Sequence, residues 1–211
     1  MVEPMSRREE MAQLRIIRLN MKHTLKILFI TGFILSSIGL LRIVYYQLKA
    51  ETAQWLLESA WQNTLLQKNN HPVKPWSWAD TWPVLKVELP SIQLSSLVLK
   101  DVSGQSLAFG PGLMTPRLYP GNHGNSFIAA HRDTHFKGLI KLKKGELIKI
   151  TNSIGEKIFF EIDQLQIVDS RIEQPILQTG DKRITLVTCY PLNSSIRNTP
   201  YRYLVSGKMI P

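Results

Sequence analysis

The stretch ITLVTCYP, from Ile184 to Pro191, decides how this chain folds and what it does. Its first five residues are β-branched or apolar, which predicts a buried strand. The strand ends at Cys189, the only cysteine in the 211 residues, so the thiol has no disulfide partner within the chain. A lone cysteine can be a small buried hydrophobe, but its position at a strand end, beside other polar candidates, favours a reactive thiol.

Two further polar side chains lie at or near the ends of apolar runs. The run 127–130 (FIAA) ends on His131, and the run 201–205 (YRYLV) contains Arg202. A thiolate nucleophile, an imidazole acid/base and a fixed cation for an oxyanion are the parts of a cysteine transpeptidase or hydrolase. The sequence therefore predicts an active site made of Cys189, His131 and Arg202.

A second arginine, Arg197, competes with Arg202 for the role of the cation. Arg197 is closer to Cys189 along the chain, but it lies in the polar segment 193–198. A loop side chain is harder to hold in one place than a strand side chain. Arg202 is therefore the predicted cation.

From Val84 onward the sequence has the character of β-structure. Short apolar runs alternate with Gly and Pro turns at roughly even spacing, which is typical of a closed barrel or a sandwich. The expected strands are 84–89, 92–99, 127–130, 146–151, 157–168, 183–188 and 202–206. The segments 107–113 and 136–142 are expected to form short helical turns.

An apolar segment precedes this region. Residues 27–41 carry no charge, and residues 43–46 extend the segment beyond Arg42 to about 20 residues, enough to cross a hydrocarbon core. The basic residues that precede it are Arg7, Arg8, Arg15, Arg18, Lys22 and Lys26. The positive-inside rule then predicts a single-pass anchor in the inner (cytoplasmic) membrane, with a cytoplasmic N-terminus and the bulk of the chain exported to the periplasm. A cleaved signal peptide is the alternative, although residues 47–51 offer no convincing cleavage site.

The expected organisation has four parts. They are a cytoplasmic basic tail (1–23), a transmembrane signal anchor (24–46), a juxtamembrane helix with a Trp/Pro-rich linker (47–83) and a catalytic domain (84–211). In the third part, Leu57, Trp61 and Leu65 recur at the spacing of a helix that packs on one face. Three tryptophans are expected to pack against the domain and not to line a ligand cleft: Trp76, Trp78 and Trp82.

The composition limits the classes of partner. The chain has 44% hydrophobic residues and an ordinary 20% of charged residues, which argues against disorder, and its net charge is +10. Its densest basic cluster is Lys137, Lys141, Lys143 and Lys144. No aromatic residues alternate with that cluster as in a single-strand binder, so a solvated surface or an anionic envelope surface is expected, and no nucleic acid.

Several motifs resemble those of the sortase family. The segment 186–191 (LVTCYP) resembles the sortase active-site motif TLxTC, and 129–133 (AAHRD) resembles the segment that carries the catalytic histidine. The segment 199–205 (TPYRYLV) resembles the last strand, which carries the catalytic arginine, and 110–112 (GPG) resembles a turn common in these enzymes. The likeness covers about residues 75–211.

Two further segments are similar to one group of sortases. These segments are 76–83 (WSWADTWP) and 131–136 (HRDTHF), and the group is that of Gram-negative, largely marine and gamma-proteobacterial, species. An anchor upstream of the domain is also usual for the family.

The resemblance implies an all-β fold: a sortase-like eight-stranded β-barrel with short helices, preceded by one N-terminal transmembrane helix. It implies a membrane-anchored cysteine transpeptidase that cleaves an LPXTG-like sorting signal near the C-terminus of a substrate protein. The reaction passes through a thioacyl-enzyme, and an amine or water accepts the acyl group. His131, Cys189 and Arg202 match the catalytic positions, while Thr188 and Ala130 are candidates for substrate contact. Thr188 could equally orient the site.

The resemblance implies no organic cofactor, and no acidic cluster here supports carrying over the calcium site of some sortases. Two alternatives stay open. The first is a zinc-binding exported domain that uses His123, His131, His135 and Cys189, because zinc accepts such ligands. The second is a non-catalytic membrane-tethered binding barrel, which would leave the cysteine, histidine and arginine unexplained.

Overall fold

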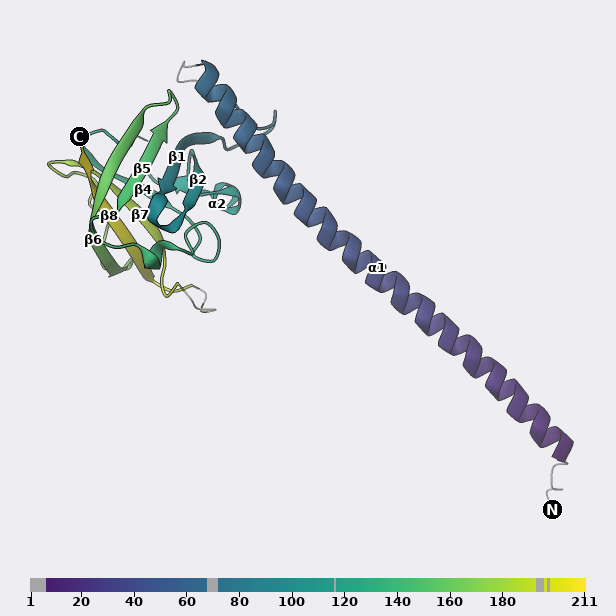
Figure 1. The fold of residues 1–211 in the computed structure, drawn as a ribbon. Coiled ribbons are helices and arrows are strands. Elements are labelled where there is room, and N and C mark those ends of the chain that lie inside the picture. Colours follow the sequence, from purple (N-terminus) through teal and green to yellow (C-terminus); the bar gives the residue numbers. More distant parts are fainter. Residues whose placement is uncertain (1–6, 68–71, 116, 193–195, 197) are drawn as a thin grey trace. The chain divides into compact units, whose positions relative to one another are not determined.

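The computed structural model describes residues 7–67, 72–115, 117–192, 196 and 198–211 (Figure 1). The chain divides into two compact units, Met1–Glu51 and Thr52–Pro211. The long helix α1 (Arg7–Gln67) forms the first unit, and its last turns belong to the second unit together with all the strands. The helix runs without a break through the segments that were expected to be a tail, a membrane span and a juxtamembrane helix.

Eight strands of the described residues close into a barrel in the order β1-β2-β3-β4-β7-β8-β6-β5. They are β1 (Pro83–Leu89), β2 (Leu94–Leu99), β3 (Gly112–Leu113), β4 (Gly124–Ala129), β5 (Leu147–Asn152), β6 (Lys157–Asp169), β7 (Lys182–Cys189) and β8 (Tyr201–Ile210). Neighbours are antiparallel except for the pairs β2–β3 and β4–β7. The expected eight-stranded barrel is confirmed, and every strand expected from the sequence forms with shifted ends.

The sequence did not predict β3. The helical turn expected at 107–113 is the helix α2 (Gly104–Phe109), which ends earlier than expected, and the last two residues of that segment form β3. A Cβ atom at Gly112 would lie 2.0 Å from the carbonyl oxygen of Asp101, so this strand needs a glycine to approach its neighbour. The turn expected at 136–142 is confirmed as the 3₁₀ helix η2 (Leu139–Lys141).

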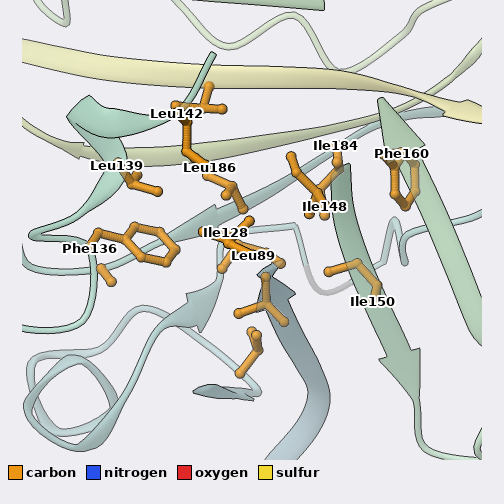
Figure 2. Close-up of a cluster of buried hydrophobic side chains, with 14 of the residues drawn as sticks. Leu89, Ile128, Phe136, Leu139, Leu142, Ile148, Ile150, Phe160, Ile184 and Leu186 are labelled. Carbon is orange, nitrogen blue, oxygen red and sulfur yellow. The ribbon is translucent and has the colours of Figure 1, made fainter. Parts of the chain in front are cut away.

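The core fills the barrel with the inward side chains of the strands (Figure 2). Among the most buried are Leu89, Ile128, Ile148, Ile150, Phe160, Ile184 and Leu186. The segment after β4 adds Phe136, Leu139 and Leu142 to the same cluster. Burial of this apolar surface stabilises the fold, and it also anchors the segment that immediately follows His131.

The last turns of α1 pack on the barrel unit. Leu57 and Trp61 are each 1% exposed, and Gln54 Nε2 donates a hydrogen bond to the carbonyl oxygen of Phe109 at 2.7 Å. The expected packing face of this helix is therefore confirmed.

The three clustered tryptophans differ from one another. Trp76 lies edge-on to Phe109 with ring centroids 5.6 Å apart, and Trp82 packs against the core. Trp78 is 79% exposed, so the expectation that all three pack is wrong for this residue. A turn closed by the bond from Ala79 N to Trp76 O leaves Trp78 on the surface.

Among the described residues, one helical segment is long and apolar enough to cross a membrane, Met21–Gln67 of α1. Signal sequences near an N-terminus and core helices of soluble proteins satisfy the same criterion. Membrane anchoring is accordingly taken up as part of the proposed function below.

Candidate active site

The pairing of β7 with β8 sets Cys189 directly opposite Arg202. Residues that face each other across antiparallel strands carry their side chains on the same face of the sheet. The preceding pair, Thr188 and Tyr203, is buried in the barrel, at 2% and 7% exposure. Because side chains alternate along a strand, Cys189 and Arg202 both lie on the outer face, and Cys189 is half-buried there.

The pairing of β4 with β7 brings His131 to the same level. Ala129 pairs with Val187 in the parallel register, and Ala130 N donates to Val187 O at 3.1 Å. When this register is continued past the end of β4, His131 falls beside Cys189. Its side chain is exposed. The thiol, the imidazole and the guanidinium that the sequence singled out thus come together at the ends of three adjacent strands.

A second histidine lies close to the first. Phe136 N donates to His131 O at 3.1 Å, which closes the segment 131–136 into a turn, and Phe136 is fully buried. His135 is half-buried in this turn. Burial lowers the pKa of His135, and the charge of the nearby His131 lowers that pKa further. The turn therefore holds two imidazoles near enough to interact.

Thr188 and Ala130 contact each other. The Thr188 hydroxyl donates to the Ala130 carbonyl oxygen at 2.8 Å, and both residues are buried. The hydroxyl is thus used inside the protein, where it ties β7 to the segment that carries His131. This bond supports an orienting role for Thr188, and substrate contact by Thr188 or Ala130 stays a prediction.

A groove of about 560 Å³ runs along the outer face of β4, β7, β8 and β6 and ends at Arg202 and Val187, next to Cys189. Near the thiol the strand side chains of its walls are apolar: Val168, Val187 and Leu204. Further along, beside Phe127, they are polar: Asn125, Gln164, Arg183, Thr185 and Ser206. From Arg183 to Cys189 the strand extends about 20 Å at ~3.3 Å per residue, which is long enough for an extended peptide.

Arg202 is held by its own strand and turn. Its Nη1 atom donates to Thr199 O at 2.6 Å and to Tyr201 O at 2.9 Å. A guanidinium carries five N–H donors, so others remain for a ligand in the groove. The competing Arg197 lies outside the described residues, and the preference for Arg202 over Arg197 stays a prediction.

The part of the chain that the structure describes contains no set of side chains that would support the zinc alternative. There, no three His, Cys, Asp or Glu side chains are grouped so that they could hold a metal ion. His123, one of the candidate zinc ligands, is exposed in the turn before β4.

Sequence reasoning missed Arg132. Its side chain is buried at 7% exposure, and Nη1 donates to Pro191 O at 2.8 Å, while Nη2 donates to Ile196 O. Its neighbour Asp133 lies 3.6 Å from Nε and is exposed. An arginine between a histidine and an aspartate has the composition of a surface segment, so the sequence does not predict its burial. Its position next to His131 is the one sequence feature that points to a role in the site.

A family model described as "Sortase domain" matches residues 87–210, more than half of the chain. The chain belongs to the sortase family. Both the residues that match and the closed barrel agree with the resemblance seen in the motifs.

Individual relatives support the same assignment. The chain is 32% identical to sortase D of Bacillus subtilis (strain 168) over 125 residues, which cover 59% of this chain and 62% of that protein's length. It is similar to the pilus-related sortase C of Group B Streptococcus, at 29% identity and a TM-score of 0.52, covering 61% of this chain and 68% of that one. The fold is also that of a Clostridium perfringens sortase D5 transpeptidase, with a TM-score of 0.61 at 20% identity, covering 76% of this chain and 99% of that one.

Proposed function

We propose that this sortase is a cysteine transpeptidase that cleaves an LPXTG-like sorting signal and transfers the acyl part to an amine, or to water when no amine is present. One observation carries the proposal. The strand registers bring Cys189, Arg202 and His131 to the neighbouring ends of three strands, and Arg202 lines the end of a groove long enough for a peptide.

In the first half of the reaction, the Cys189 thiolate attacks the carbonyl carbon of the threonine in the sorting signal. A thiol is mostly protonated at neutral pH, and nearby cations favour the thiolate. The free N–H groups of Arg202 stabilise the negative oxygen that forms, because a guanidinium keeps its charge throughout. His131 gives a proton to the departing amine, the C–N bond breaks, and a thioester to Cys189 remains.

In the second half, an acceptor amine attacks the thioester carbonyl. His131 takes a proton from the attacking nitrogen, the new amide forms, and the sulfur leaves as thiolate. Water can follow the same route and gives a free carboxylate. Thr188 and Ala130 assist by holding the two strands in register through their hydrogen bond.

The test is capture of the thioester. The barrel unit is mixed with a fluorogenic LPXTG peptide, and hydrolysis and transfer to an added amine are followed together with intact-protein mass. We expect cleavage and an adduct of the acyl fragment on Cys189 that hydroxylamine removes. Absence of both cleavage and adduct across peptides with varied sorting signals would contradict the proposal. Thiol labelling that a bound peptide does not affect would favour the binding-barrel alternative.

The N-terminal helix suggests where in the cell the protein acts. We propose that residues 24–46 of α1 span the inner membrane with the basic tail 1–23 in the cytoplasm, so that the catalytic domain 84–211 is periplasmic. The apolar helix and the basic residues before it support this. The segments 76–83 and 131–136 support a place in the sortase group of Gram-negative species.

Truncation tests the role of the N-terminal part. A protein that starts at Lys49 keeps the buried face of α1 with Leu57 and Trp61. We expect it to be soluble and to cleave the peptide at nearly the rate of the full-length enzyme in detergent. In fractionated cells, the full-length protein should be found with the inner membrane and should be accessible to protease from the periplasm. Loss of activity in a folded truncated protein would contradict a purely anchoring role.

A further inference from the structure

A pair of hydrogen-bonded ties brackets the segment that carries Cys189 and His131. On the strand side, the residue before the cysteine, Thr188, donates to the residue before the histidine, Ala130. On the loop side, the residue after the histidine, Arg132, donates to Pro191, two residues after the cysteine. The bonds are both 2.8 Å long, and each joins the β4 segment to the β7 segment.

We propose that Arg132 is a positioning residue that fixes the spacing between the Cys189 thiol and the His131 imidazole. The proposal rests on the proposed function, in which Cys189 attacks the scissile carbonyl carbon while His131 protonates the departing amine, so both side chains act on one bond. After β7 ends, Tyr190 N still donates to Tyr201 O at 3.0 Å, which ties this part of the chain to β8 but not to the segment of His131. The arginine adds the link from the loop to the residue next to His131.

The geometry of the guanidinium suits this role. Nη1 and Nη2 donate to two carbonyl oxygens of the β7–β8 connection, those of Pro191 and Ile196. A planar fork of donors holds both acceptors in one plane, which a flexible ammonium group cannot do. The connection that links Cys189 to Arg202 is thereby tied to the residue next to His131.

The environment of Arg132 also separates it from an ordinary surface arginine. It is 7% exposed, and its one carboxylate neighbour among the described residues, Asp133, lies 3.6 Å from Nε with a largely exposed side chain. Burying a charge is costly unless its hydrogen bonds are satisfied. Here two backbone carbonyls satisfy it, so removal of the guanidinium would release the loop instead of leaving a buried carboxylate unpaired.

The experiment compares Arg132→Met and Arg132→Lys with wild type and with Ile150→Ala. Ile150 is a fully buried core residue on β5, so this control loses stability without touching the site. All proteins are assayed at a temperature at which circular dichroism shows them folded. We expect kcat for peptide cleavage to fall on the order of 100-fold in Arg132→Met, with KM changed little, because misplacement by about 1 Å costs that much. Lysine should recover part of the loss, and Ile150→Ala should keep the wild-type kcat.

A second readout needs no substrate. The rate of Cys189 alkylation by iodoacetamide is measured against pH for wild type, Arg132→Met and His131→Ala. If Arg132 sets the distance between thiol and imidazole, the profile of Arg132→Met should move toward that of His131→Ala, while Ile150→Ala keeps the wild-type profile. A folded Arg132→Met with wild-type kcat and a wild-type alkylation profile would overturn the proposal. If the wild-type enzyme cleaves no sorting peptide, the proposed function fails, and the alkylation profiles still decide the role of Arg132.

Discussion

Each end of the groove has an arginine, and the two arginines differ in their hydrogen-bond and ion-pair partners. At the far end, the Arg183 guanidinium pairs with two carboxylates, those of Asp163 and Asp181. At the end beside the thiol, the acceptors of Arg202 among the described residues are two backbone carbonyl oxygens. Both side chains lie on the outer face of neighbouring strands, so position in the sheet does not explain the difference.

The two arginines differ in how far neighbouring groups neutralise the charge of the guanidinium. Two carboxylates neutralise Arg183, and the hydrogen bond with Asp163 is the main cause that raises the pKa of Arg183. Carbonyl oxygens orient Arg202 without cancelling its charge. An oriented but uncompensated cation is what stabilises an anion that appears in a transition state. The far end thus carries a structural ion-pair site, and the near end carries the cation to which the proposed function gives the oxyanion role.

The largest effect should come from the thiol itself. Cys189→Ala removes the proposed nucleophile, and we expect the strand and its backbone pairing to stay in place. We expect peptide cleavage and thioester formation to disappear, with an unchanged circular dichroism spectrum and unfolding midpoint. Wild-type turnover by the folded variant would mean that the reactive end of the groove is elsewhere.

A matched pair of substitutions tests the arginines directly. Arg202→Lys keeps the charge but loses the planar fork, and we expect kcat to fall about 100- to 1,000-fold, the size of effect seen when one oxyanion donor is lost. Arg183→Lys should mainly lower the unfolding midpoint or raise KM, because that residue acts through ion pairs at the far end. Steady-state kinetics with thermal unfolding separates the two. Equal losses of kcat in Arg202→Lys and Arg183→Lys would contradict the difference proposed between the two arginines. A larger loss of kcat in Arg197→Lys than in Arg202→Lys would assign the oxyanion role to Arg197.

Much of this site follows from the sequence because its parts lie on regular elements. Cys189 and Arg202 sit at the facing ends of β7 and β8, and His131 follows β4 directly. A strand pattern in the sequence predicts where a strand ends, and the end of a barrel strand is where a side chain can face a groove. The motif resemblance supplied the barrel closure, which local periodicity alone left open between barrel and sandwich.

The parts that were missed depend on contacts between distant segments. A strand of two residues such as β3 has no periodicity to detect, and it forms because Gly112 allows a close approach to another segment. Arg132 is buried because the connection after β7 folds over it, nearly sixty residues further along the chain. Trp78 is exposed because a turn directs it outward, which apolar character does not reveal. Such features become visible in the tertiary structure.

The smallest expected effect concerns the pH dependence of stability that arises in the turn 131–136. The pKa of His135 is lowered in the folded state by burial and by the charge of His131, so folding favours the neutral imidazole. As the pH falls below about 6.5, the unfolded chain binds a proton at His135 more readily than the folded protein does. The free energy of unfolding should therefore decrease until the pH reaches the lowered pKa of the folded state.

His135→Gln should make this decrease shallower in urea titrations of the barrel unit between pH 7.5 and 5. His123→Gln, at an exposed position before β4, should keep the wild-type slope. Identical slopes for His135→Gln and wild type would show that neither burial nor His131 lowers the pKa of His135 on folding, and would contradict this prediction.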